Sequence, residues 1–452
     1  MLKFPFRLLR VSYCFHSFLL LAGFLLLGGI LNSVSAVNYD ESKVPEYTLP
    51  DPLVFNDGSA VKTVADWTGK RRAEIFRHFQ EEMYGFLPEM LAKAGNHPDF
   101  VTFRLLESSD DALDGKAIRK QVELTFTNPQ KPGKKVTANL LLYIPKNAQK
   151  PVPAFLGLNF YGNHAVENDP AILLFHNRDG KILTEETVDK EGKRSRGGNR
   201  TQWLAPKLIE NGYALATMHY IDLANDSLQN GFRTGLFDLY SDYENDASRG
   251  PADWGSITAW AWGLSRALDY LETDELIDAK KVAVLGHSRL GKTALWAGAS
   301  DERFAFVISN NSGCGGAALS RREFGETIQI MSGGLRYWFC PNFCKFGPRV
   351  NDFAIDQHEL IALAAPRPVY AASAQNDQWA DPKGEYLSCL HAVPVYELFG
   401  IEKPFAGRTV PKMAELNTSV GNVIGHHIRT GKHDVTEFDW EQYIRFADKF
   451  LK

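Results

Sequence analysis

The sequence predicts an α/β fold in which a doubly wound, mostly parallel sheet is flanked by helices. Three observations support this prediction. From about residue 120 onward, short apolar runs alternate with segments of helical periodicity. The apolar runs have the length and composition of strands that are buried on both faces. Strand–helix alternation, in turn, implies parallel strands joined by right-handed crossovers.

These runs define the elements that we expect. The expected strands are Thr137–Ile144, Ala154–Leu158, Tyr213–Met218, Val282–Leu285, Ala305–Ile308 and Pro368–Ala372. The expected helices are Ala73–Tyr84, Gln202–Glu210, Ile257–Leu271, Lys292–Ala299, Gln357–Leu363 and Trp440–Phe450. The segment His176–Arg200 is rich in Gly, Arg, Lys and Glu, which indicates a surface insertion.

The first 36 residues have the pattern of a secretory signal peptide. Lys3, Arg7 and Arg10 form a positively charged start, and an apolar stretch follows at residues 18–31. Ser-Val-Ser-Ala then ends at Ala36, which is a small-residue cleavage pattern. The alternative is an uncleaved anchor, because the apolar stretch is close to the length that spans a bilayer. We expect cleavage near Ala36 and a secreted or periplasmic protein.

The remaining chain is predicted to consist of an N-terminal extension at residues 37–110, packed on the core, and a single catalytic domain at residues 111–452. A composition of 44% hydrophobic and 23% charged residues is that of an ordinary globular protein. The net charge of -4 and the lack of a basic run argue against nucleic-acid binding. We expect no integral membrane span in the mature chain. A monomer is our working expectation, but the sequence leaves the oligomeric state open.

Four cysteines follow the signal peptide. Export would place them in a compartment that permits disulfides, and four cysteines allow three pairings among which the sequence does not choose. The Cys and His spacings do not match a zinc site, so we expect neither a metal nor another cofactor. The four are Cys314, Cys340, Cys344 and Cys389.

The segment Val282–Lys292 predicts a nucleophilic serine. An apolar strand leads into Gly286-His-Ser288-Arg-Leu, and Gly291 begins a helix. The second glycine lies one position later than in G-x-S-x-G, yet small residues still flank a tight strand-to-helix turn. Such a turn exposes the serine Oγ and directs backbone N–H groups toward an oxyanion. Gly-x-Ser turns also occur in proteins that catalyse nothing, but the flanking strand and helix favour Ser288 as a nucleophile in an α/β-hydrolase fold.

In this fold the nucleophile is followed along the chain by an acid and then by a histidine. Asp377 lies just beyond the expected strand Pro368–Ala372 and suits the acid. Its alternative role is to cap the next helix, which Asp381 fits better. His433 lies in a glycine-containing loop before the last helix and suits the base. His426 and His427 lie on an expected strand, and we interpret them as structural.

Four motifs occur in order along the chain, at Gly286–Lys292, Ser312–Arg322, Gln378–Gly384 and Gly431–His433. Together they resemble the bacterial glucuronoyl esterases, which form carbohydrate esterase family fifteen. The similarity covers most of the chain after the signal peptide and is densest from Trp254 onward. The resemblance implies a serine esterase that cleaves esters of 4-O-methyl-glucuronic acid in glucuronoxylan with lignin alcohols, through a glucuronoyl-enzyme intermediate and without a cofactor.

The resemblance also implies residue roles. Ser288 matches the nucleophile, His433 the general base, and Arg289 an arginine that supports the oxyanion. One position departs from the pattern. Many members, the fungal ones especially, place the catalytic carboxylate before the Ser-Gly-x-Gly-Gly run, where this chain has Asn311. Other bacterial members place it where this chain has Asp377. We therefore predict the triad Ser288, His433 and Asp377, of which the acid is the member that the sequence constrains least.

Three more residues match side chains that bind the hydroxyls of the glucuronate ring: Lys292, Glu326 and Trp379. Lys292 lies one helical turn beyond Ser288, so its side chain can point back toward the serine. The alternatives are an exposed helix lysine, a solvated carboxylate and a packing tryptophan. The functional interpretation predicts a clamp around the sugar.

Two other functions remain open at this point. An acetyl-xylan esterase would use the same triad, but its acetyl group would give a ring-hydroxyl clamp nothing to hold. A catalytically silent carbohydrate-binding protein on a hydrolase scaffold is the second, since a fold does not determine a function. The complete Ser, His and Asp set argues against it.

Overall fold

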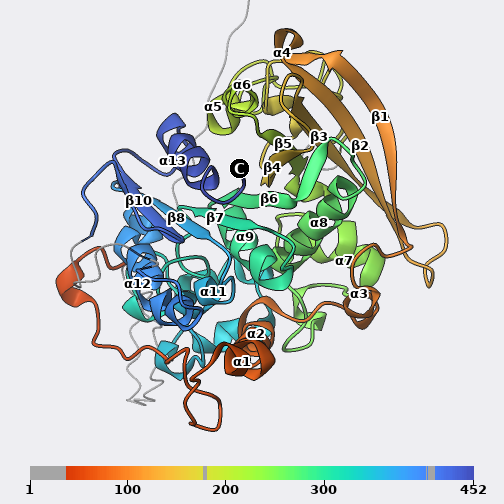
Figure 1. Ribbon diagram of the computed structural model, residues 1–452. Helices are drawn as coiled ribbons and strands as arrows, with labels where there is room; N and C mark the ends of the chain where they lie inside the picture. Colours follow the sequence, from red (N-terminus) through yellow and green to blue (C-terminus); the bar gives the residue numbers. More distant parts are fainter. Residues whose placement is uncertain (1–36, 177–180, 404, 406–412) are drawn as a thin grey trace, which may run out of the picture. The chain divides into compact units, whose positions relative to one another are not determined.

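A ten-stranded mixed sheet runs through the molecule (Figure 1). The computed structural model describes residues 37–176, 181–403, 405 and 413–452, so the predicted signal peptide lies outside the described residues. The strand order is β1-β2-β3-β5-β4-β6-β7-β8-β10-β9. The strands are β1 Val101–Asp111, β2 Ala117–Thr127, β3 Lys135–Pro145, β4 Val152–Asn159, β5 Ala214–His219, β6 Ile277–His287, β7 Phe306–Asn310, β8 Val369–Ala374, β9 Thr418–Val420 and β10 Ile424–Arg429.

The centre of the sheet is parallel and its margins are antiparallel. Neighbouring strands from β5 through β4, β6, β7 and β8 to β10 all pair in parallel. The strands β1, β2 and β3 form an antiparallel margin next to β5, and β9 pairs antiparallel with β10 at the other end. Every residue of β5, β7, β8 and β10 is buried, as expected for strands covered on both faces.

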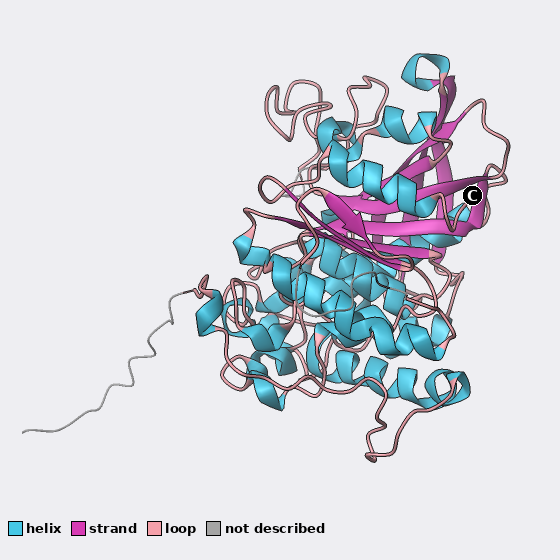
Figure 2. Ribbon diagram, turned by 60° about the vertical axis from the view of Figure 1, so that its left-hand side comes forward, coloured by secondary structure: helices cyan, strands magenta, loops and turns pink. Residues whose placement is uncertain are grey.

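Helices cover both faces of the sheet (Figure 2). The larger hydrophobic core contains α2, α8, α9, α11 and α12, and the smaller one contains α6 and α13. The predicted doubly wound α/β architecture is therefore confirmed. The helices are α1 Val64–Asp66, α2 Arg72–Phe79, α3 Glu89–Ala94, α4 Ala112–Gly115, α5 Arg200–Trp203, α6 Ala205–Glu210, α7 Gly235–Tyr240, α8 Ser256–Leu271, α9 Arg289–Ser300, α10 Ile328–Met331, α11 Gln357–Ala362, α12 Pro382–Leu398 and α13 Glu437–Ala447.

Each of the six expected strands occurs, but one expected helix is broken. The segment predicted as a continuous helix at Gln202–Glu210 consists of α5 and α6, with Leu204 between them at φ 42°. Pro206 lies in the first turn of α6; it has no N–H to donate to the Gln202 carbonyl, and its ring would clash with that carbonyl in a continuous helix. The apolar periodicity correctly predicted which face of this helical segment is buried, but it did not predict the break.

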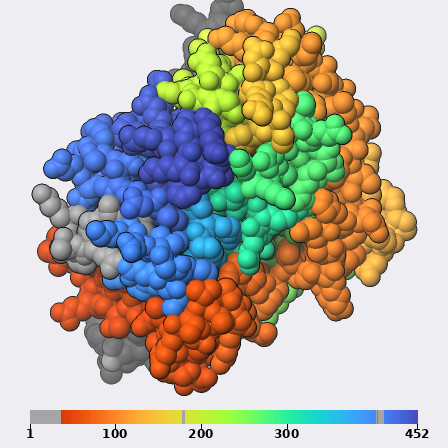
Figure 3. All heavy atoms as spheres, in the orientation of Figure 1, coloured from red at the N-terminus to blue at the C-terminus, as the bar shows by residue number. Residues whose placement is uncertain are grey.

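The N-terminal extension packs on the helical face of the main body. The buried Arg71 donates to Glu359 of α11 over 3.2 Å. Figure 3 shows the N-terminal residues, in red, against the blue C-terminal part of the chain. The first strand of the sheet, β1, begins at Val101. The domain boundary that we expected between residues 110 and 111 therefore falls inside this strand, just before its last residue.

Two further expectations concern the chain as a whole. Within the described ranges, no helix is both long enough and apolar enough to cross a membrane. Cys314, Cys340, Cys344 and Cys389 all carry free thiols, so the structure forms none of the three pairings that the sequence allowed.

Candidate active site

The candidate catalytic residues follow the carboxyl ends of four adjacent parallel strands. Ser288 follows β6, Asn311 follows β7, Asp377 lies beyond β8 and His433 lies beyond β10. Because these strands are neighbours in the sheet, their carboxyl ends meet at one edge, where open α/β sheets bind ligands. Backbone hydrogen bonds join the loops: the Ser288 N–H donates to Asn310 O over 2.9 Å, and the Asn376 N–H donates to Gly431 O over 3.0 Å.

Ser288 lies on the sharp strand-to-helix turn that the sequence predicted. Its backbone has φ 58° and ψ −130°, a conformation that is costly for any residue with a side chain. The turn needs glycine at 286, since a Cβ there would come within 1.9 Å of the Leu290 carbonyl oxygen. Ser288 also immediately precedes α9, so the first N–H groups of that helix lie beside it.

His433 and Asp377 form a hydrogen-bonded pair. The His433 Nδ1 lies 2.6 Å from Asp377 Oδ2. The Asp377 side chain is 5% exposed and that of His433 is 40% exposed, so the carboxylate is sheltered while the imidazole reaches solvent. Burial acts to raise the pKa of Asp377, but hydrogen bonds from His433 and Asn311 outweigh it and lower the pKa. The acid is therefore ionised, and with Nδ1 held, Nε2 of His433 is the nitrogen left to act as a base.

The ring of His287, the residue before Ser288, packs against the ring of His433. The centroids of the two rings are 4.4 Å apart. The His287 Nδ1 hydrogen-bonds to Asn310 Oδ1 over 2.7 Å. Burial and the neighbouring His433 lower the pKa of His287 to about 3, so this ring stays neutral. The predicted base thus lies beside the residue that adjoins the predicted nucleophile.

A second histidine–aspartate pair lies inside the protein. His427 Nε2 is 2.9 Å from Asp439 Oδ1, and both side chains are fully buried. His426 is also buried and contacts the Ser373 hydroxyl over 3.2 Å. Because both histidines lie within β10, neither is placed to meet a substrate, which agrees with their structural interpretation.

Asn311 occupies the position at which the resemblance noted from the sequence places the acid of many members. Its Nδ2 donates to Asp377 Oδ2 over 2.8 Å, so it binds the same oxygen that accepts from His433. Its backbone has φ 48° and its N–H donates to Ala372 O over 2.7 Å. Asn311 therefore contributes a hydrogen-bond donor to Asp377, the carboxylate that we predict as the acid.

Arg289, the residue after Ser288, is held in place by a buried carboxylate. Its guanidinium pairs with Asp226 and lies over Trp338, 4.7 Å from the ring centroid. Asp226 also accepts from the Tyr337 hydroxyl over 2.5 Å and from the Trp338 indole over 2.8 Å. Burial acts to raise the pKa of Asp226, but Arg289 and these donors lower it. Sequence reasoning missed Asp226, because it lies in a loop without a motif.

The three residues predicted to bind the sugar lie in contact with one another. Lys292 Nζ donates to Glu326 Oε2 over 2.7 Å, and Trp379 Nε1 donates to Glu326 Oε1 over 3.3 Å. Lys292 also donates to the carbonyl oxygens of Ser312 and Cys314, so its three ammonium protons all have acceptors. Lys292 is 2% exposed, whereas Trp379 is 38% exposed. Of the three, Trp379 is the most accessible to a ligand and Lys292 the most enclosed.

A buried carboxylate supports the same loop from the other side. Glu385 Oε1 accepts from the backbone N–H groups of Ser312 and Gly313 over 2.7 and 3.1 Å. Its other oxygen accepts from the Ser373 hydroxyl over 2.6 Å. The loop that follows β7 is thus held by Lys292 through its carbonyls and by Glu385 through its amides. Burial raises the pKa of Glu385 to about 8.

Glu385 predicts a dependence of stability on pH. A carboxyl group with its pKa raised from 4.5 to about 8 stays protonated in the native state at pH values where the unfolded chain releases the proton. Its contribution is therefore complete below pH 4.5 and is lost as the pH rises through 8. We expect the unfolding temperature of Glu385→Gln to decline less than that of the wild type between about pH 5 and pH 8.

The measurement is thermal unfolding of both proteins across this range. Burial raises the pKa of Glu359 to about 8 as well, so some dependence should remain in Glu385→Gln. Identical slopes in the two proteins would show that Glu385 is ionised in the native state.

Comparisons with known proteins decide the family. Residues 200–400 match the family described as "Glucuronyl esterase, fungi". The chain is 45% identical over 421 residues to "Carbohydrate esterase MZ0003" from an unknown prokaryotic organism, covering 92% of this chain and 92% of that protein. The solved "Glucuronoyl Esterase from Solibacter usitatus" matches with a TM-score of 0.80 at 43% identity, covering 91% of this chain and all of that one. This chain belongs to carbohydrate esterase family fifteen, the glucuronoyl esterases.

A more distant relative of the esterase is "4-O-methyl-glucuronoyl methylesterase 1" from Wolfiporia cocos. It is 29% identical over 374 residues, which cover 80% of the esterase and 75% of that protein. The family assignment makes the esterase a carboxylic ester hydrolase and confirms the α/β-hydrolase fold.

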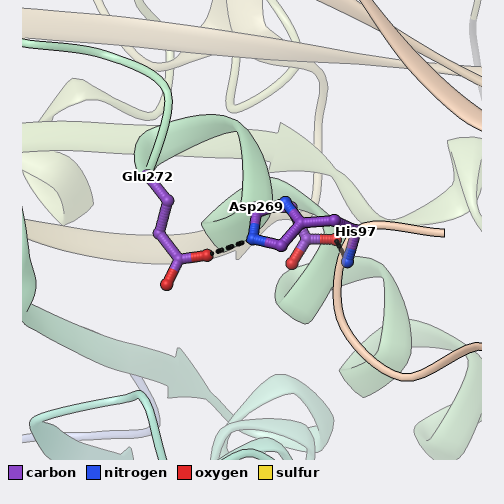
Figure 4. A group of neighbouring side chains, drawn as sticks. All are labelled: His97, Asp269 and Glu272. Atoms are coloured by element: carbon purple, nitrogen blue, oxygen red, sulfur yellow. Dashed lines mark hydrogen bonds and ion pairs between the residues drawn. The ribbon is translucent and has the colours of Figure 1, made fainter. Parts of the chain in front are cut away.

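In the described part of the esterase, one cluster of polar side chains has ligand atoms close enough together to hold a cation. It consists of His97, Asp269 and Glu272 (Figure 4). Arg303 Nη1, however, lies 2.8 Å from Asp269 and 2.7 Å from Glu272. The guanidinium already pairs with both carboxylates, so we interpret the cluster as an ion-pair network and assign no metal to it.

Proposed function

We propose that the esterase hydrolyses esters of 4-O-methyl-glucuronic acid, carried by glucuronoxylan, with lignin alcohols. The observation that supports this proposal is the arrangement of two groups around one helix N-terminus. The His433–Asp377 pair lies against His287, the residue before Ser288, and Lys292 of α9 donates to Glu326, which also accepts from Trp379. The first group suits acyl transfer, and the second offers charged and aromatic partners for a sugar acid.

In the proposed acylation step, Ser288 Oγ attacks the C6 carbonyl carbon of the glucuronate. His433 Nε2 takes the hydroxyl proton, and the ionised Asp377 stabilises the imidazolium that forms. The tetrahedral oxyanion is held by the Arg289 guanidinium and by the backbone N–H at the start of α9. Asp226 keeps the guanidinium in place, so little reorganisation is needed as the negative charge develops.

The intermediate then collapses and the alcohol leaves with the proton of His433. Water, deprotonated by His433, hydrolyses the glucuronoyl-enzyme through a second oxyanion. The proton path is reversed, and Ser288 regains its hydrogen.

The sugar contacts give a direct test of the substrate. Replacing Glu326 with glutamine keeps the shape but removes the charge that can accept from ring hydroxyls. We expect kcat/KM for benzyl glucuronate to fall by about 10- to 100-fold, the value of one or two charged hydrogen bonds. Hydrolysis of 4-nitrophenyl acetate should change little, because its acetyl group has no hydroxyl that could donate to Glu326.

Lys292→Ala should likewise slow hydrolysis of the glucuronate ester more than that of the acetate ester, but it also removes a support of the loop after β7. Glu326→Gln in turn removes the counter-charge of the buried Lys292, so the activities of both variants should be compared with their unfolding temperatures. Equal losses on both esters in Glu326→Gln would contradict the sugar-binding role and favour a general carbohydrate esterase such as an acetyl-xylan esterase.

We also propose that the esterase is exported, to the periplasm or beyond. The support is the charged start, the apolar stretch and the small-residue pattern that ends at Ala36. An ester between xylan and lignin is outside the cell, so export agrees with the proposed substrate. N-terminal sequencing of the secreted protein should give Val37 as the first residue.

A further inference from the structure

Two exposed aromatic side chains lie on either side of one short segment, Phe324–Glu326. Among the large hydrophobic side chains that are exposed in the described part of the chain, only Tyr39 and Trp379 are aromatic, and their exposures are 52% and 38%. The N–H of Glu326 donates to the Trp379 carbonyl over 2.8 Å. On the other side, the Tyr39 ring meets that of Phe324 edge to face, with centroids 6.2 Å apart.

Tyr39 is held in place on both sides, although it lies near the start of the described chain. Before it, the Asn38 carbonyl accepts from the Gly325 N–H over 2.8 Å. After it, Glu41 pairs with the buried Arg322 over 2.8 Å and with Lys383 of α12. Chain ends are ordinarily mobile unless they are tied down. Here the ties connect Tyr39 to the two segments that supply Glu326 and Trp379.

Single exposed hydrophobic side chains are common and need no explanation. The position of Tyr39 is different in two respects. Its neighbour in space is the segment that ends in Glu326, which we place at the sugar. Its backbone is also fixed before any ligand arrives, so binding would cost little ordering entropy.

We propose that Tyr39 stacks against a sugar unit of the polysaccharide chain that carries the glucuronate, next to the contacts made by Glu326 and Trp379. This inference rests on the proposed function, since it assumes that the glucuronate lies at Glu326. An aromatic ring offers a flat apolar face that complements the C–H face of a pyranose and stays largely indifferent to its hydroxyls. Residues that follow the predicted cleavage site would then form part of the substrate surface.

The test compares two esters that differ in size. Benzyl glucuronate ends at the acid sugar, whereas the methyl ester of a xylo-oligosaccharide substituted with 4-O-methyl-glucuronate extends beyond it. For Tyr39→Ala we expect KM on the oligosaccharide ester to rise about three- to tenfold, as for the loss of one aromatic contact. The change on benzyl glucuronate should be clearly smaller. Tyr39→Phe should retain the wild-type KM, because stacking needs the ring and not the hydroxyl.

Leu105→Ala is a matched control, since Leu105 is 54% exposed and lies on β1, remote in the sheet order from β8 and β10. It should change neither reaction. An unchanged KM on the oligosaccharide ester in Tyr39→Ala would overturn the inference. An equal rise of KM on both esters would also overturn it, because it would mean that Tyr39 only supports the glucuronate pocket.

A wild-type protein that hydrolyses neither ester would instead overturn the proposed function. Calorimetric binding of the unesterified oligosaccharide to the wild type and to Tyr39→Ala distinguishes these failures, because it does not depend on catalysis. Weaker binding by the variant would support Tyr39 even then, and equal binding would contradict it.

Discussion

Replacing Ser288 with alanine is expected to lower kcat for benzyl glucuronate by about 10⁵-fold or more, comparable to the loss of the nucleophile in other serine hydrolases. The covalent path needs the Oγ, and no other hydroxyl can take its place on the turn between β6 and α9. The oxyanion donors remain, so any residual rate should reflect water attack in an intact site. Initial rates with the purified variant, at saturating substrate, provide the measurement.

A second substitution at the same position separates chemistry from folding. Ser288 adopts φ 58° and ψ −130°, a conformation that glycine reaches without strain. We expect Ser288→Gly to be as inactive as Ser288→Ala while its free energy of unfolding rises by about 1–3 kcal/mol. Activity in either variant above about a hundredth of the wild-type rate would contradict the assignment of Ser288.

Asp377→Asn is expected to lower kcat by about 10³- to 10⁴-fold. The asparagine keeps the shape of the side chain but loses the charge that stabilises the His433 imidazolium. It can also present an N–H to Nδ1, which would favour the wrong tautomer of the ring. The KM for benzyl glucuronate should change little, because the sugar contacts through Glu326 are untouched. Steady-state kinetics of the variant test this split.

Asn311 offers a control that is specific to this chain. Its amide binds the same Asp377 oxygen as His433, so a carboxylate at position 311 would lie near the imidazole. In the double variant Asp377→Asn with Asn311→Asp, we expect part of the lost kcat to return. Near-wild-type activity of the single variant Asp377→Asn would show that another carboxylate orients His433.

The sequence predicted well those features that depend on local pattern. The strands β4, β5, β7 and β8 and the second half of β6 are apolar runs because both of their faces are buried. The turn at Ser288 is visible as glycines around a serine between a strand and a helix. The order of Asp377 and His433 after Ser288 follows from the order of the parallel strands. Their location beyond these strands led to the prediction of both residues, and the structure brings their side chains within 2.6 Å of each other.

Other features could not be read from the pattern for physical reasons. The edge strand β1 is largely exposed and carries polar and charged residues, so it lacks the continuous apolar run of an inner strand. The helix α12 was only implied by the capping role of Asp381. It is buried on nearly all sides, so it has no amphipathic period, and Pro394 lies inside it.

The support around the site was also hidden from the sequence. Asp226 and Glu385 act through contacts with residues far away in the chain, and neither belongs to a motif. The contact of Asn311 with Asp377 spans two loops. Such pairs are set by tertiary packing, so one sequence without a structure does not reveal them.

The central claim is that Ser288 is the activated nucleophile of this esterase. The measurement that tests it most directly is labelling of the folded protein with a fluorophosphonate, followed by peptide mass spectrometry. We predict one adduct per chain, on Ser288, and labelling that is strongly reduced in His433→Ala. A protein that does not react, or that carries the label on another serine, would contradict the account.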